Sequence, residues 1–446
     1  MKKFSYKQVT RYLDDCLIFG IKPDLTRIKK ILELTGNPHK KNDFIHIVGT
    51  NGKTSTTIIT ASILKSHGLK CGYHISPHIN SYTERIWIDG KDISESNFED
   101  IFNFLYPYIE KVNSLNLGGP MTQFEIIAAM AFTAAVNKKL DVMVLEAGMG
   151  GRWDATNAAY SKVVGFTGVS LEHTQILGKN ITEIAIEKAE VVKNNALVAT
   201  LSRSDKVLKV LKNKVEKTNS KLYIYGKDFY ILNKHRDCLK GWKTDIKGII
   251  SSYKGLNVPL IGNYQPFNLS LSIALSELYL NALAKKINDK LLRSSLKNLK
   301  VLGRFQIIKK IPLVIADTSH NPEGIKNFVK NIKECFNDFR KIVIFAVLKD
   351  KDYKKMTSSI LEISDILILT SSKTDRSLYV DELEKEVKKA VEIKKQNKEE
   401  VDSGIMPEEI YKIDNISNSL NYALKISKSS DIICITGSIT NLENIV

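Results

Sequence analysis

The segment His46–Thr57, with the sequence HIVGTNGKTSTT, constrains the fold more than any other part of the chain. It joins an apolar strand ending at Val48 to a helix beginning near Lys53, through a turn bracketed by two glycines. Gly49 and Gly52 allow backbone N–H groups to approach an anion closely, and the N-terminus of the helix adds a partial positive charge. A strand, a glycine-rich turn and a helix in this order are typical of a nucleotide-phosphate loop.

The side chains of this loop match the needs of a bound phosphate. Only Thr50 and Asn51 separate the first glycine from the Gly-Lys pair, so the spacing is shorter than in the usual P-loop. Lys53 is expected to reach the β- and γ-phosphates, and the hydroxyl of Thr54 or Ser55 to bind Mg²⁺. An ordinary glycine-rich turn is the alternative. The predicted ATP-binding residues of the loop are Gly49, Thr50, Asn51, Gly52, Lys53, Thr54 and Ser55.

Length and hydropathy indicate a chain of more than one domain. The 446 residues can bury a sizeable core and suggest two or three domains. No apolar run reaches the roughly 18 residues of a transmembrane helix, and the first segment, MKKFSYKQVTRYLDD, is charged rather than signal-like. We therefore expect a soluble cytoplasmic protein. The scattered cysteines favour a reducing compartment and argue against a zinc site; they are Cys16, Cys71, Cys238, Cys335 and Cys434.

The formal net charge of +17 raises the question of nucleic-acid binding. Lysine outnumbers arginine several-fold, and the lysines are spread along the chain instead of forming a basic stripe interleaved with aromatic residues. A general lysine bias explains this pattern better than a nucleic-acid groove, and a basic surface also suits a small polyanionic substrate. We expect small-molecule substrates and a monomer, with neither nucleic acid nor a membrane as partner.

The phosphate loop lies in a first region where apolar runs alternate with helical patterns. The run Asp141–Glu146 is almost entirely apolar and ends in an acid, as expected of an inner parallel strand, and Lys162–Val169 is a second such run. The loop Ser76–Gly90 follows a short strand, and α/β sheets bind ligands in loops at the carboxyl ends of strands. The expected helices are Tyr6–Phe19, Thr26–Thr35, Thr54–Gly68, Ser94–Asn113 with a kink at Pro107, Thr122–Lys138, Ile181–Lys193, part of Gly262–Leu280, and Asp289–Leu299.

A second region begins after a linker at Leu302–Arg304, where the composition shifts. Strands and helices alternate there, which indicates another α/β domain. The expected strands are Pro312–Ala316, Lys341–Val347, Ile366–Thr370 and Ile432–Thr436, and the expected helices are Gly324–Cys335, Lys354–Glu362 and Val380–Val391. The charged stretch Lys385–Val401 is expected to form an exposed helix end and a loop. We predict an α/β fold: a P-loop-type ATPase domain with a mainly parallel sheet, residues 1–299, followed by a smaller Rossmann-like α/β domain, residues 300–446.

Polar residues stand at several of the predicted strand ends. Glu146 could bind Mg²⁺ at the sheet edge of the phosphate loop, or cap the backbone. His173 follows the next strand, where a single histidine is more often structural than a ligand, and Lys188 lies on a helix, where a lysine is usually just solvated. Asp317 and His320, in ADTSHNPEG, repeat the strand-end pattern in the second region or form an Asp/Asn turn. These residues alone fit a kinase, an ATPase or an ATP-driven ligase.

Eight motifs extend the argument, because they occur in one order between about Thr26 and Ser438. They are GTNGKTST, SPHINSYTERIWIDG, VLEAGMGGRWDATN, LEHTQILGKNITEIAIEKAEVVK, GNYQPFN, LGRFQ, ADTSHNP and VLKDKD. In this order they resemble folylpolyglutamate synthase and the bifunctional dihydrofolate synthase, relatives of the Mur ligases. The resemblance implies ATP-dependent amide formation, in which a folate carboxylate attacks the γ-phosphate and the amino group of L-glutamate displaces phosphate from the acyl phosphate.

The resemblance also implies roles for residues at matching positions. The implied cofactors are ATP and one or two Mg²⁺ ions, and a place for a monovalent cation is left open. Magnesium ligands would be Ser76, Glu146, His173, the loop hydroxyl of Ser55 and Lys188 in the form of a carbamate. The catalytic residues would be Lys53, Lys188, Asp317 and His320. The nucleotide would also meet Asn268, Arg304 and Asp317, and the substrate would meet His78, Thr122, Phe124 and Arg152.

The chain departs from the family pattern at a few positions. Thr54 stands where the family usually has glycine, which is closer to the Mur ligases, and Glu190 replaces a glycine of the lysine motif. Tyr264 stands where the family has a histidine, and Thr318-Ser319 stand where it has Gly-Ala before His320. We expect these changes to affect acceptor specificity more than phosphoryl transfer.

Two alternative functions remain open at this point. One is a Mur-type amino-acid ligase, or a paralogue that acts on another carboxylic acid. A Mur ligase normally carries a nucleotide-sugar domain before its phosphate loop, whereas 48 residues precede Gly49 here. The other is a basic, nucleic-acid-binding ATPase, which would hydrolyse ATP in response to nucleic acid. The ligase would instead release phosphate only with glutamate and a folate or pteroate acid.

Overall fold

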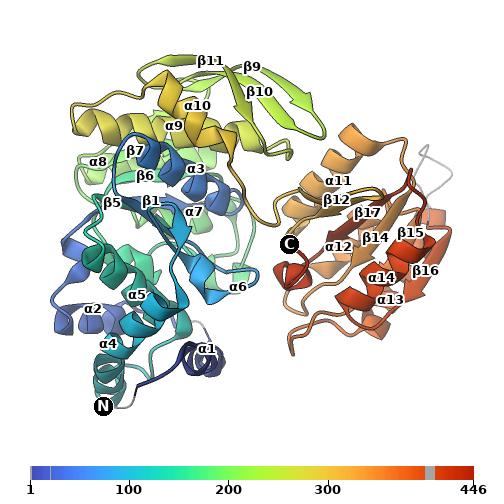
Figure 1. Ribbon diagram of the computed structural model, residues 1–446, viewed down its shortest axis with the longest axis horizontal. Coiled ribbons are helices and arrows are strands. Elements are labelled where there is room, and N and C mark those ends of the chain that lie inside the picture. The colour runs from blue at the N-terminus through green and yellow to red at the C-terminus, as the bar shows by residue number, and fades with distance from the viewer. Residues whose placement is uncertain (1–2, 21, 397–406) are drawn as a thin grey trace. The chain divides into compact units, whose positions relative to one another are not determined.

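The computed structural model of the protein describes residues 3–20, 22–396 and 407–446, which form two compact units (Figure 1). Unit 1 comprises Met1–His235, Trp242–Pro259 and Tyr264–Leu299. Unit 2 comprises Arg236–Gly241, Leu260–Asn263 and Lys300–Val446. None of the helices in the described ranges is both long and apolar enough to cross a membrane.

Unit 1 is organised around an eight-stranded sheet with the order β4-β3-β2-β5-β1-β6-β7-β8. The strands are β1 (Asp43–Val48), β2 (Cys71–His74), β3 (Ile86–Ile88), β4 (Lys91–Asp92), β5 (Val142–Glu146), β6 (Ser161–Phe166), β7 (Leu197–Thr200) and β8 (Lys221–Ile224). All neighbours pair in parallel except β2 with β3 and β3 with β4, which are antiparallel. The predicted α/β fold with a mainly parallel sheet is confirmed.

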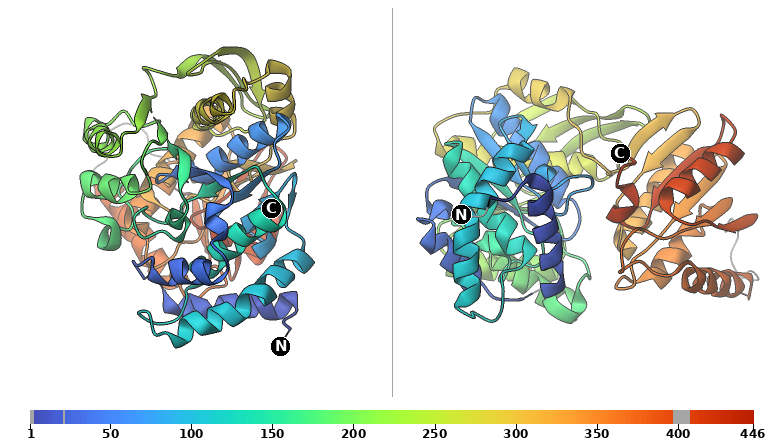
Figure 2. Two further views of the ribbon diagram at one scale, coloured as in Figure 1. Left: turned by 90° about the vertical axis from the view of Figure 1, so that its left-hand side faces the viewer. Right: turned by 60° about the horizontal axis from the view of Figure 1, so that its bottom comes forward.

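Helices cover both faces of this sheet, as Figures 1 and 2 show. Successive side chains of a strand point to opposite faces of the sheet, so the apolar residues of β1 pack into the hydrophobic core on each face. Ile45 and Ile47 pack with α3 (Lys53–Ser66) and α9 (Gln265–Ala282) on one face. Phe44 packs with α5 (Gln123–Asn137) on the other face, where its ring meets Phe132 edge-on with centroids 5.4 Å apart. The phosphate-loop strand is therefore rigidly held in the middle of the unit.

The remaining helices of unit 1 agree with the sequence patterns apart from details. The expected helix Tyr6–Phe19 is α-helical only over α1 (Tyr6–Asp15) and continues as a 3₁₀ turn, Cys16–Phe19, that ends at Gly20. The helix α4 (Glu95–Ser114) continues through Pro107. The others are α2 (Thr26–Leu34), α6 (Thr174–Leu177), α7 (Ile181–Ala189), α8 (Asp205–Lys217) and α10 (Asp289–Lys297). Further 3₁₀ turns cover Pro38–Lys40, Tyr82–Arg85 and Ala155–Ala158.

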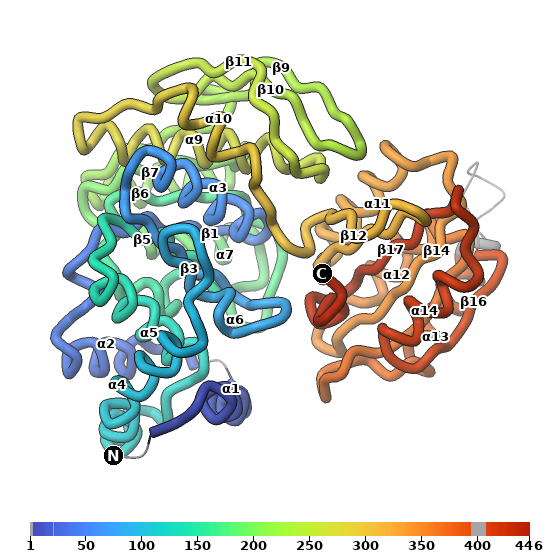
Figure 3. Tube along the Cα trace, viewed as in Figure 1, coloured from blue at the N-terminus to red at the C-terminus, as the bar shows by residue number. Residues whose placement is uncertain are grey.

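A second, three-stranded antiparallel sheet follows β8 and has the order β11-β10-β9. Its strands are β9 (Tyr230–Asp237), β10 (Gly241–Lys247) and β11 (Ser252–Val258), and α10 packs against β11. The tube in Figure 3 shows the hairpin of β9 and β10 within this sheet. The polar residues Asn233 to Asp237 interrupt the apolar alternation of β9, which is largely exposed. The hairpin strands belong to unit 1, but the hairpin tip, Arg236–Gly241, belongs to unit 2.

Unit 2 contains a six-stranded sheet with the order β12-β13-β17-β14-β15-β16. The strands are β12 (Gln306–Lys310), β13 (Leu313–Ala316), β14 (Lys341–Phe345), β15 (Ile366–Leu369), β16 (Glu409–Lys412) and β17 (Ile432–Thr436), parallel except for β12. The helices are α11 (Pro322–Phe336), α12 (Tyr353–Ile360), α13 (Val380–Gln396) and α14 (Ile416–Ile426), followed by a 3₁₀ turn, Ile439–Leu442. The inner strands β14 and β17 are completely buried. The predicted second α/β domain is confirmed.

Sequence reasoning missed some elements of unit 2. The edge strand β12 follows the predicted linker, and β16 and α14 lie in the stretch between Val391 and Ile432, where no element was predicted. The strand β16 has only four residues, three of them exposed and two of them charged, so it carries little apolar signal. The predicted loop at the end of Lys385–Val401 falls partly on residues 397–401, outside the described ranges.

The cysteines do not all remain separate, although they are scattered in the sequence. Cys238 and Cys335, 97 residues apart, form a disulfide within unit 2. The other three, Cys16, Cys71 and Cys434, are free and buried. The pairing was not predictable, because it depends on the hairpin tip packing against α11.

Candidate active site

The phosphate loop adopts the conformation that its glycines were expected to allow. Gly49 has φ 149° and Gly52, which caps the N-terminus of α3, has φ 90°, both unfavourable for residues with a side chain. A Cβ atom on Gly49 would lie 2.9 Å from the carbonyl oxygen of Gly168, and one on Gly52 would lie 2.6 Å from Oδ1 of Asn268. Both glycines are therefore needed to bring the loop close to its neighbours.

Lys53 lies at the start of α3 and folds back over the loop. Its Nζ donates hydrogen bonds to the carbonyl oxygens of Gly49, at 3.2 Å, and Thr50, at 3.0 Å. The backbone N–H of Thr50 donates a hydrogen bond to the carbonyl oxygen of Gly168 at 2.8 Å. This bond fixes the loop against the segment after β6. The ammonium group of Lys53 therefore lies at the loop, where a change of side-chain rotamer would bring it to a phosphate bound by the loop.

The two hydroxyls after Lys53 make different contacts. Thr54 Oγ1 donates to Oε1 of Glu146 at 3.0 Å, so the loop hydroxyl and the acid at the end of β5 meet. Ser55 Oγ instead accepts a hydrogen bond from Nε2 of Gln265 at 3.3 Å, and Gln265 Oε1 accepts one from Nδ2 of Asn268 at 3.1 Å. Asn268 thereby lies beneath the loop, as expected of a nucleotide-site residue, and Gln265 is an additional site residue not singled out from the sequence.

Glu146 lies beside the phosphate loop because β5 pairs with β1. The register places Glu146 opposite Ile47, two residues before Gly49, and the side chain is only 2% exposed. Ser76 lies near the loop after β5: its Oγ would be 3.3 Å from a Cβ on Gly148, and the ring of Phe124 lies still closer, at 2.7 Å. Glycine at 148 thus leaves room for Ser76 and Phe124 to approach the loop after β5.

Lys188 is buried rather than solvated. It is 1% exposed, and its Nζ donates to the carbonyl oxygen of Gly49 and to Oε1 of Glu172, both at 2.8 Å. Burial lowers the pKa of Lys188, and the negative charge of Glu172 opposes that shift. Burial alone would raise the pKa of Glu172, but Lys188 and Lys53 outweigh it and hold this pKa at about 2. Glu172 was missed, although it directly precedes the predicted ligand His173.

His173 begins the short helix α6 with φ 46°, a backbone conformation that is uncommon for residues with a side chain. Its side chain is exposed. Within the described ranges, no three His, Cys, Asp or Glu side chains gather closely enough to hold a metal ion. Mg²⁺, however, usually takes one or two protein carboxylates and fills its octahedron with phosphate oxygens and water. The oxygen donors of Thr54 and Glu146 fit that pattern, and the full ligand set remains a prediction.

One of the predicted substrate residues, His78, contacts a buried arginine, Arg85. Arg85 Nε donates to Nδ1 of His78 at 2.8 Å, Nη1 donates to Oε1 of Gln123 at 3.3 Å, and the guanidinium lies over the ring of Tyr82. Burial and the neighbouring Arg85 charge lower the pKa of His78 to about 3, so the imidazole is neutral. Sequence reasoning did not single out Arg85; a charged residue inside an alternating strand pattern was the available signal.

Thr122, Phe124 and Arg152 have defined structural contacts. Thr122 caps α5 in a capping box with Glu125. Phe124 follows two residues later; its ring centroid lies 6.0 Å from that of His74, and the ring faces the glycine loop after β5. Arg152 forms an ion pair with Glu187, at 3.0 Å, and thus faces α7. Its predicted substrate role stays a prediction.

In unit 2, the segment after β13 is held by its own polar residues. Asp317 is 3% exposed and accepts the backbone N–H groups of Phe305, at 2.8 Å, and Ser319, at 2.9 Å. Burial raises the pKa of Asp317, while hydrogen bonds from Ser319 and the nearby Arg304 charge act against this. Arg304 donates to Oγ1 of Thr318. His320 Nδ1 lies 2.9 Å from the carbonyl oxygen of Thr318, which favours the tautomer protonated at Nδ1. These five predicted or departing positions, Arg304, Asp317, Thr318, Ser319 and His320, lie together in one cluster.

Comparisons with known proteins agree with this arrangement. The model of the Mur ligase middle domain matches residues 47–276, and that of the Mur ligase glutamate ligase domain matches residues 303–439. The chain is 31% identical over 380 residues to the dihydrofolate synthase/folylpolyglutamate synthase of Bacillus subtilis, covering 85% of this chain and 88% of that protein.

Solved structures of this kind are also similar. Mycobacterium tuberculosis folylpolyglutamate synthase complexed with ADP and AMPPCP superposes with a TM-score of 0.87 at 27% identity, covering 98% of this chain and 96% of that one. An FPGS–AMPPCP–folate complex gives a TM-score of 0.83 at 25% identity, covering 99% of this chain and 98% of that one. The two domain matches and the near-complete coverage place this chain in the Mur ligase superfamily, as a member of its folylpolyglutamate and dihydrofolate synthase family.

Proposed function

We propose that this protein is an ATP-dependent ligase that adds L-glutamate to the carboxylate of a folate through an acyl phosphate. The observation that carries the proposal is the meeting of the phosphate loop with Glu146, through Thr54, at one edge of the sheet. Membership of the ligase family supports the reaction type, and the relatives' names support a folate acceptor.

On the phosphate side, the chain supplies positive charge and fixed donors. The Nζ of Lys53 exchanges its bonds to the loop carbonyl oxygens for bonds to the β- and γ-phosphates. Gln265 and Asn268 hold Ser55 and the loop from below. A cation placed in advance on the transferring phosphoryl group stabilises the charge that develops in the transition state.

Magnesium is the expected metal of this site. The residues that would hold it are Glu146 and the hydroxyl of Thr54 or Ser55, with Ser76 and His173 as further ligands implied by the family pattern. When bound, Mg²⁺ neutralises phosphate charge. The oxygen atoms of Glu146, Ser76 and the loop hydroxyl are the hard donors that this ion prefers.

Lys188 is a candidate for carbamylation, as the family resemblance implies. Its burial lowers its pKa and so favours the neutral amine, which is the form that reacts with carbon dioxide. A carbamate on Lys188 would exchange a cation for an anion beside Glu172, now 2.8 Å from Nζ. Two anions at that distance require a positive partner. Lys53, whose charge already lowers the pKa of Glu172, supplies part of it, and we propose a second Mg²⁺ or a monovalent cation for the rest.

We assign the ATP side of the reaction to residues 1–299 and the glutamate side to residues 300–446. In the second part, Asp317 keeps the backbone of the segment after β13 in place, and His320 and Arg304 present polar groups from the same segment. Handling of the incoming glutamate by this segment is supported by the glutamate-ligase domain match over residues 303–439.

The acceptor acid is proposed to lie near Phe124, Thr122 and His78. The aromatic ring and the neutral imidazole suit a flat pterin ring, and buried Arg85 adds positive charge near a substrate carboxylate. Dihydropteroate is a second candidate acceptor, because relatives such as the Bacillus subtilis protein carry both activities in their names.

A phosphate-release panel tests the function. Purified protein with ATP, Mg²⁺ and glutamate receives tetrahydrofolate, dihydropteroate or a Mur-type precursor, and the product is identified by mass spectrometry. We expect phosphate release and one added glutamate with the folate, and dihydrofolate with dihydropteroate if both activities coexist. Release with the Mur-type precursor alone would support the Mur-type alternative, and background release in all arms would refute the ligase assignment.

The setting of the enzyme is also part of the proposal. A monomer in the cytoplasm, acting on small molecules without nucleic acid or membrane partners, agrees with the ATP requirement and with the spread of lysines along the chain. Nucleic acid added to the phosphate-release panel is expected to leave the rate unchanged.

A further inference from the structure

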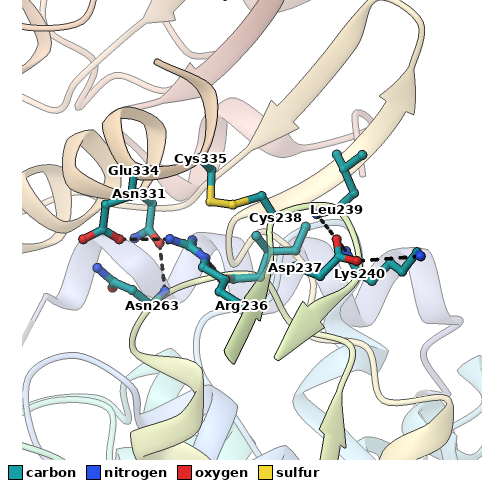
Figure 4. Close-up of a disulfide and its surroundings, with 10 residues drawn as sticks. Arg236, Asp237, Cys238, Leu239, Lys240, Asn263, Asn331, Glu334 and Cys335 are labelled. Atoms are coloured by element: carbon teal, nitrogen blue, oxygen red, sulfur yellow. Dashed lines mark hydrogen bonds and ion pairs between the residues drawn. A yellow bond between two sulfur atoms is a disulfide. The ribbon is translucent and has the colours of Figure 1, made fainter. Parts of the chain in front are cut away.

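We propose that Cys238 and Cys335 form a reversible thiol–disulfide strap that slows turnover when it is closed. The strap joins the tip of the β9–β10 hairpin to α11, as Figure 4 shows. The proposal rests on the proposed ligase function for its effect on turnover, but the bond itself can be tested without that function.

The two cysteines are placed for bond formation by the surrounding contacts. Their Cα atoms are 5.5 Å apart, within the range that a disulfide spans. Two residues before Cys238, Arg236 donates to the carbonyl oxygen of Ile261 and to Oδ1 of Asn331 and pairs with Glu334 at 3.0 Å. Asn331 also accepts the backbone N–H of Asn263 at 2.8 Å. These bonds hold the hairpin tip on α11 beside the two sulfur atoms (Figure 4).

Accessibility separates this pair from the other cysteines. Cys238 and Cys335 are both partly exposed, so a small thiol or disulfide reagent can reach them. The free cysteines are buried, and burial raises the pKa of Cys16 to about 11 and raises the pKa of Cys71 and of Cys434 as well. Because the thiolate is the reactive form, those three thiols are unreactive near neutral pH. Thiol chemistry of the folded protein is therefore confined to one pair.

The reaction balances by thiol–disulfide exchange with a low-molecular-weight disulfide. The thiolate of one cysteine attacks a sulfur of that disulfide, which releases one small thiol and leaves a mixed disulfide on the protein. The second cysteine, as its thiolate, displaces the other small thiol and forms the Cys238–Cys335 bond. The two protein thiols are oxidised, one small disulfide is reduced to two thiols, and an added dithiol reverses the sequence.

The effect on turnover follows from the path of the chain. The hairpin strands, up to His235 and from Trp242, belong to unit 1, while the tip Arg236–Gly241 belongs to unit 2. A bond from Cys238 to α11 lies within unit 2 and fixes there the short segment to which both hairpin strands of unit 1 are joined. Proposed catalytic residues lie in both units, Lys53 in one and Asp317 in the other. Movements of domains commonly limit turnover in such enzymes, so a tie that restricts them slows the reaction.

The test compares the full-length protein equilibrated in oxidised and reduced small-thiol buffers. Peptide mapping without reduction measures the fraction of Cys238–Cys335 bond, and hydrogen exchange measures the mobility of residues 230–258. We expect the bond to form reversibly, hydrogen exchange in the hairpin to slow on oxidation, and kcat for glutamate addition to fall several-fold while the Kd of ADP stays unchanged.

Variants separate the strap from general oxidation. The double variant Cys238→Ser/Cys335→Ser should keep the kcat of the reduced protein in both buffers. Cys16→Ser, which removes a buried thiol and leaves the strap, should respond to oxidation like the original protein. Failure of the bond to form would overturn the proposal, as would equal kcat in the two states of an active enzyme. Absence of ligase activity in both states would instead count against the proposed function, and unchanged hydrogen exchange in that case would also overturn the strap.

Discussion

The carboxylates of Glu146 and Asp317 occupy similar places in two different sheets but are bound in different ways. Each stands at the carboxyl end of a buried parallel strand, β5 in unit 1 and β13 in unit 2. Glu146 receives a side-chain hydroxyl, from Thr54, whereas Asp317 receives two backbone N–H groups, from Phe305 and Ser319. Phe305 has φ 51°, so Asp317 stabilises a backbone conformation that is otherwise unfavourable.

The comparison teaches that an acid at a strand end has no fixed role. An acid bound by a mobile hydroxyl can exchange that partner for a metal or a substrate. An acid bound by two backbone N–H groups contributes mainly to the shape of its loop. We therefore expect changes near Glu146 to affect phosphoryl transfer, and a change at Asp317 to affect the stability of unit 2 as well as activity.

Removal of divalent cations should have the largest effect. Without Mg²⁺, the charge on the transferring phosphoryl group and on Glu146 is not neutralised. Phosphate release in the presence of excess chelator should fall to background, and added Mg²⁺ should restore it. The thermal unfolding of unit 2, followed by hydrogen exchange in β13 and β17, should not change. Sustained phosphate release in excess chelator would contradict the proposal that Glu146 helps to bind a required Mg²⁺.

Replacement of the loop lysine should have the next largest effect. In Lys53→Ala, a cation is lost from the developing phosphoryl charge, a change that typically costs on the order of 3 to 4 kcal/mol or more in the barrier. The steady-state rate of phosphate release should fall by orders of magnitude. Lys65→Ala, at the other end of α3, is the matched control and should remain active. A near-normal rate for Lys53→Ala would refute its role.

Replacement of the buried lysine of α7 should give a loss that is partly reversible. Lys188→Ala removes the group proposed to form a carbamate, so activity should be lost. Short carboxylates such as acetate or propionate should restore part of it by filling the space of the missing group, and rates are measured across a series of carboxylate concentrations. Lys193→Ala, close by in sequence, is the control. If Lys188→Ala were fully active, the carbamate proposal would be wrong.

The smallest effect should distinguish the two acids directly. In Asp317→Asn, the one oxygen of the amide takes the place of two carboxylate oxygens, so one of the two backbone N–H groups loses its acceptor. A buried donor without an acceptor costs about 1 to 3 kcal/mol of stability. Thermal unfolding of unit 2 should shift to lower temperature. Glu146→Gln keeps an oxygen that can accept the Thr54 hydroxyl, so its unfolding temperature should hardly change while its activity falls. Equal destabilisation by both substitutions would remove the distinction.

Much of the fold could be predicted because the buried strands are continuous apolar runs. The runs around β1, β5 and β14 have this pattern, and glycine, proline and asparagine mark the ends of several helices. The bounds and pairing of the exposed strand β9, and the existence of β16, could not be predicted, because polar and charged residues interrupt the apolar alternation there. The local sequence does not predict such edge strands, because their formation depends on the strand with which they pair.

The candidate site was predictable in part. The phosphate loop and Glu146 could be placed together because the carboxyl ends of parallel strands share one edge. The burial of Lys188 and its pairing with Glu172 could not, because a lysine on a helix gives no sign of the face it occupies. Arg85 and Gln265 were missed for the same reason: their importance lies in hydrogen bonds between segments distant in the sequence.

The division of the chain also bears on how such enzymes can exchange parts. Unit 2 includes Arg236–Gly241 and Leu260–Asn263, which are encoded well before Lys300. A fragment that begins at residue 300 would leave α11 without the guanidinium of Arg236 and without Cys238. Recombination between related genes at that boundary would therefore pair α11 with a foreign hairpin tip. To stay intact in such an exchange, unit 2 needs Arg236–Gly241 and Leu260–Asn263 as well as the residues from Lys300 onward.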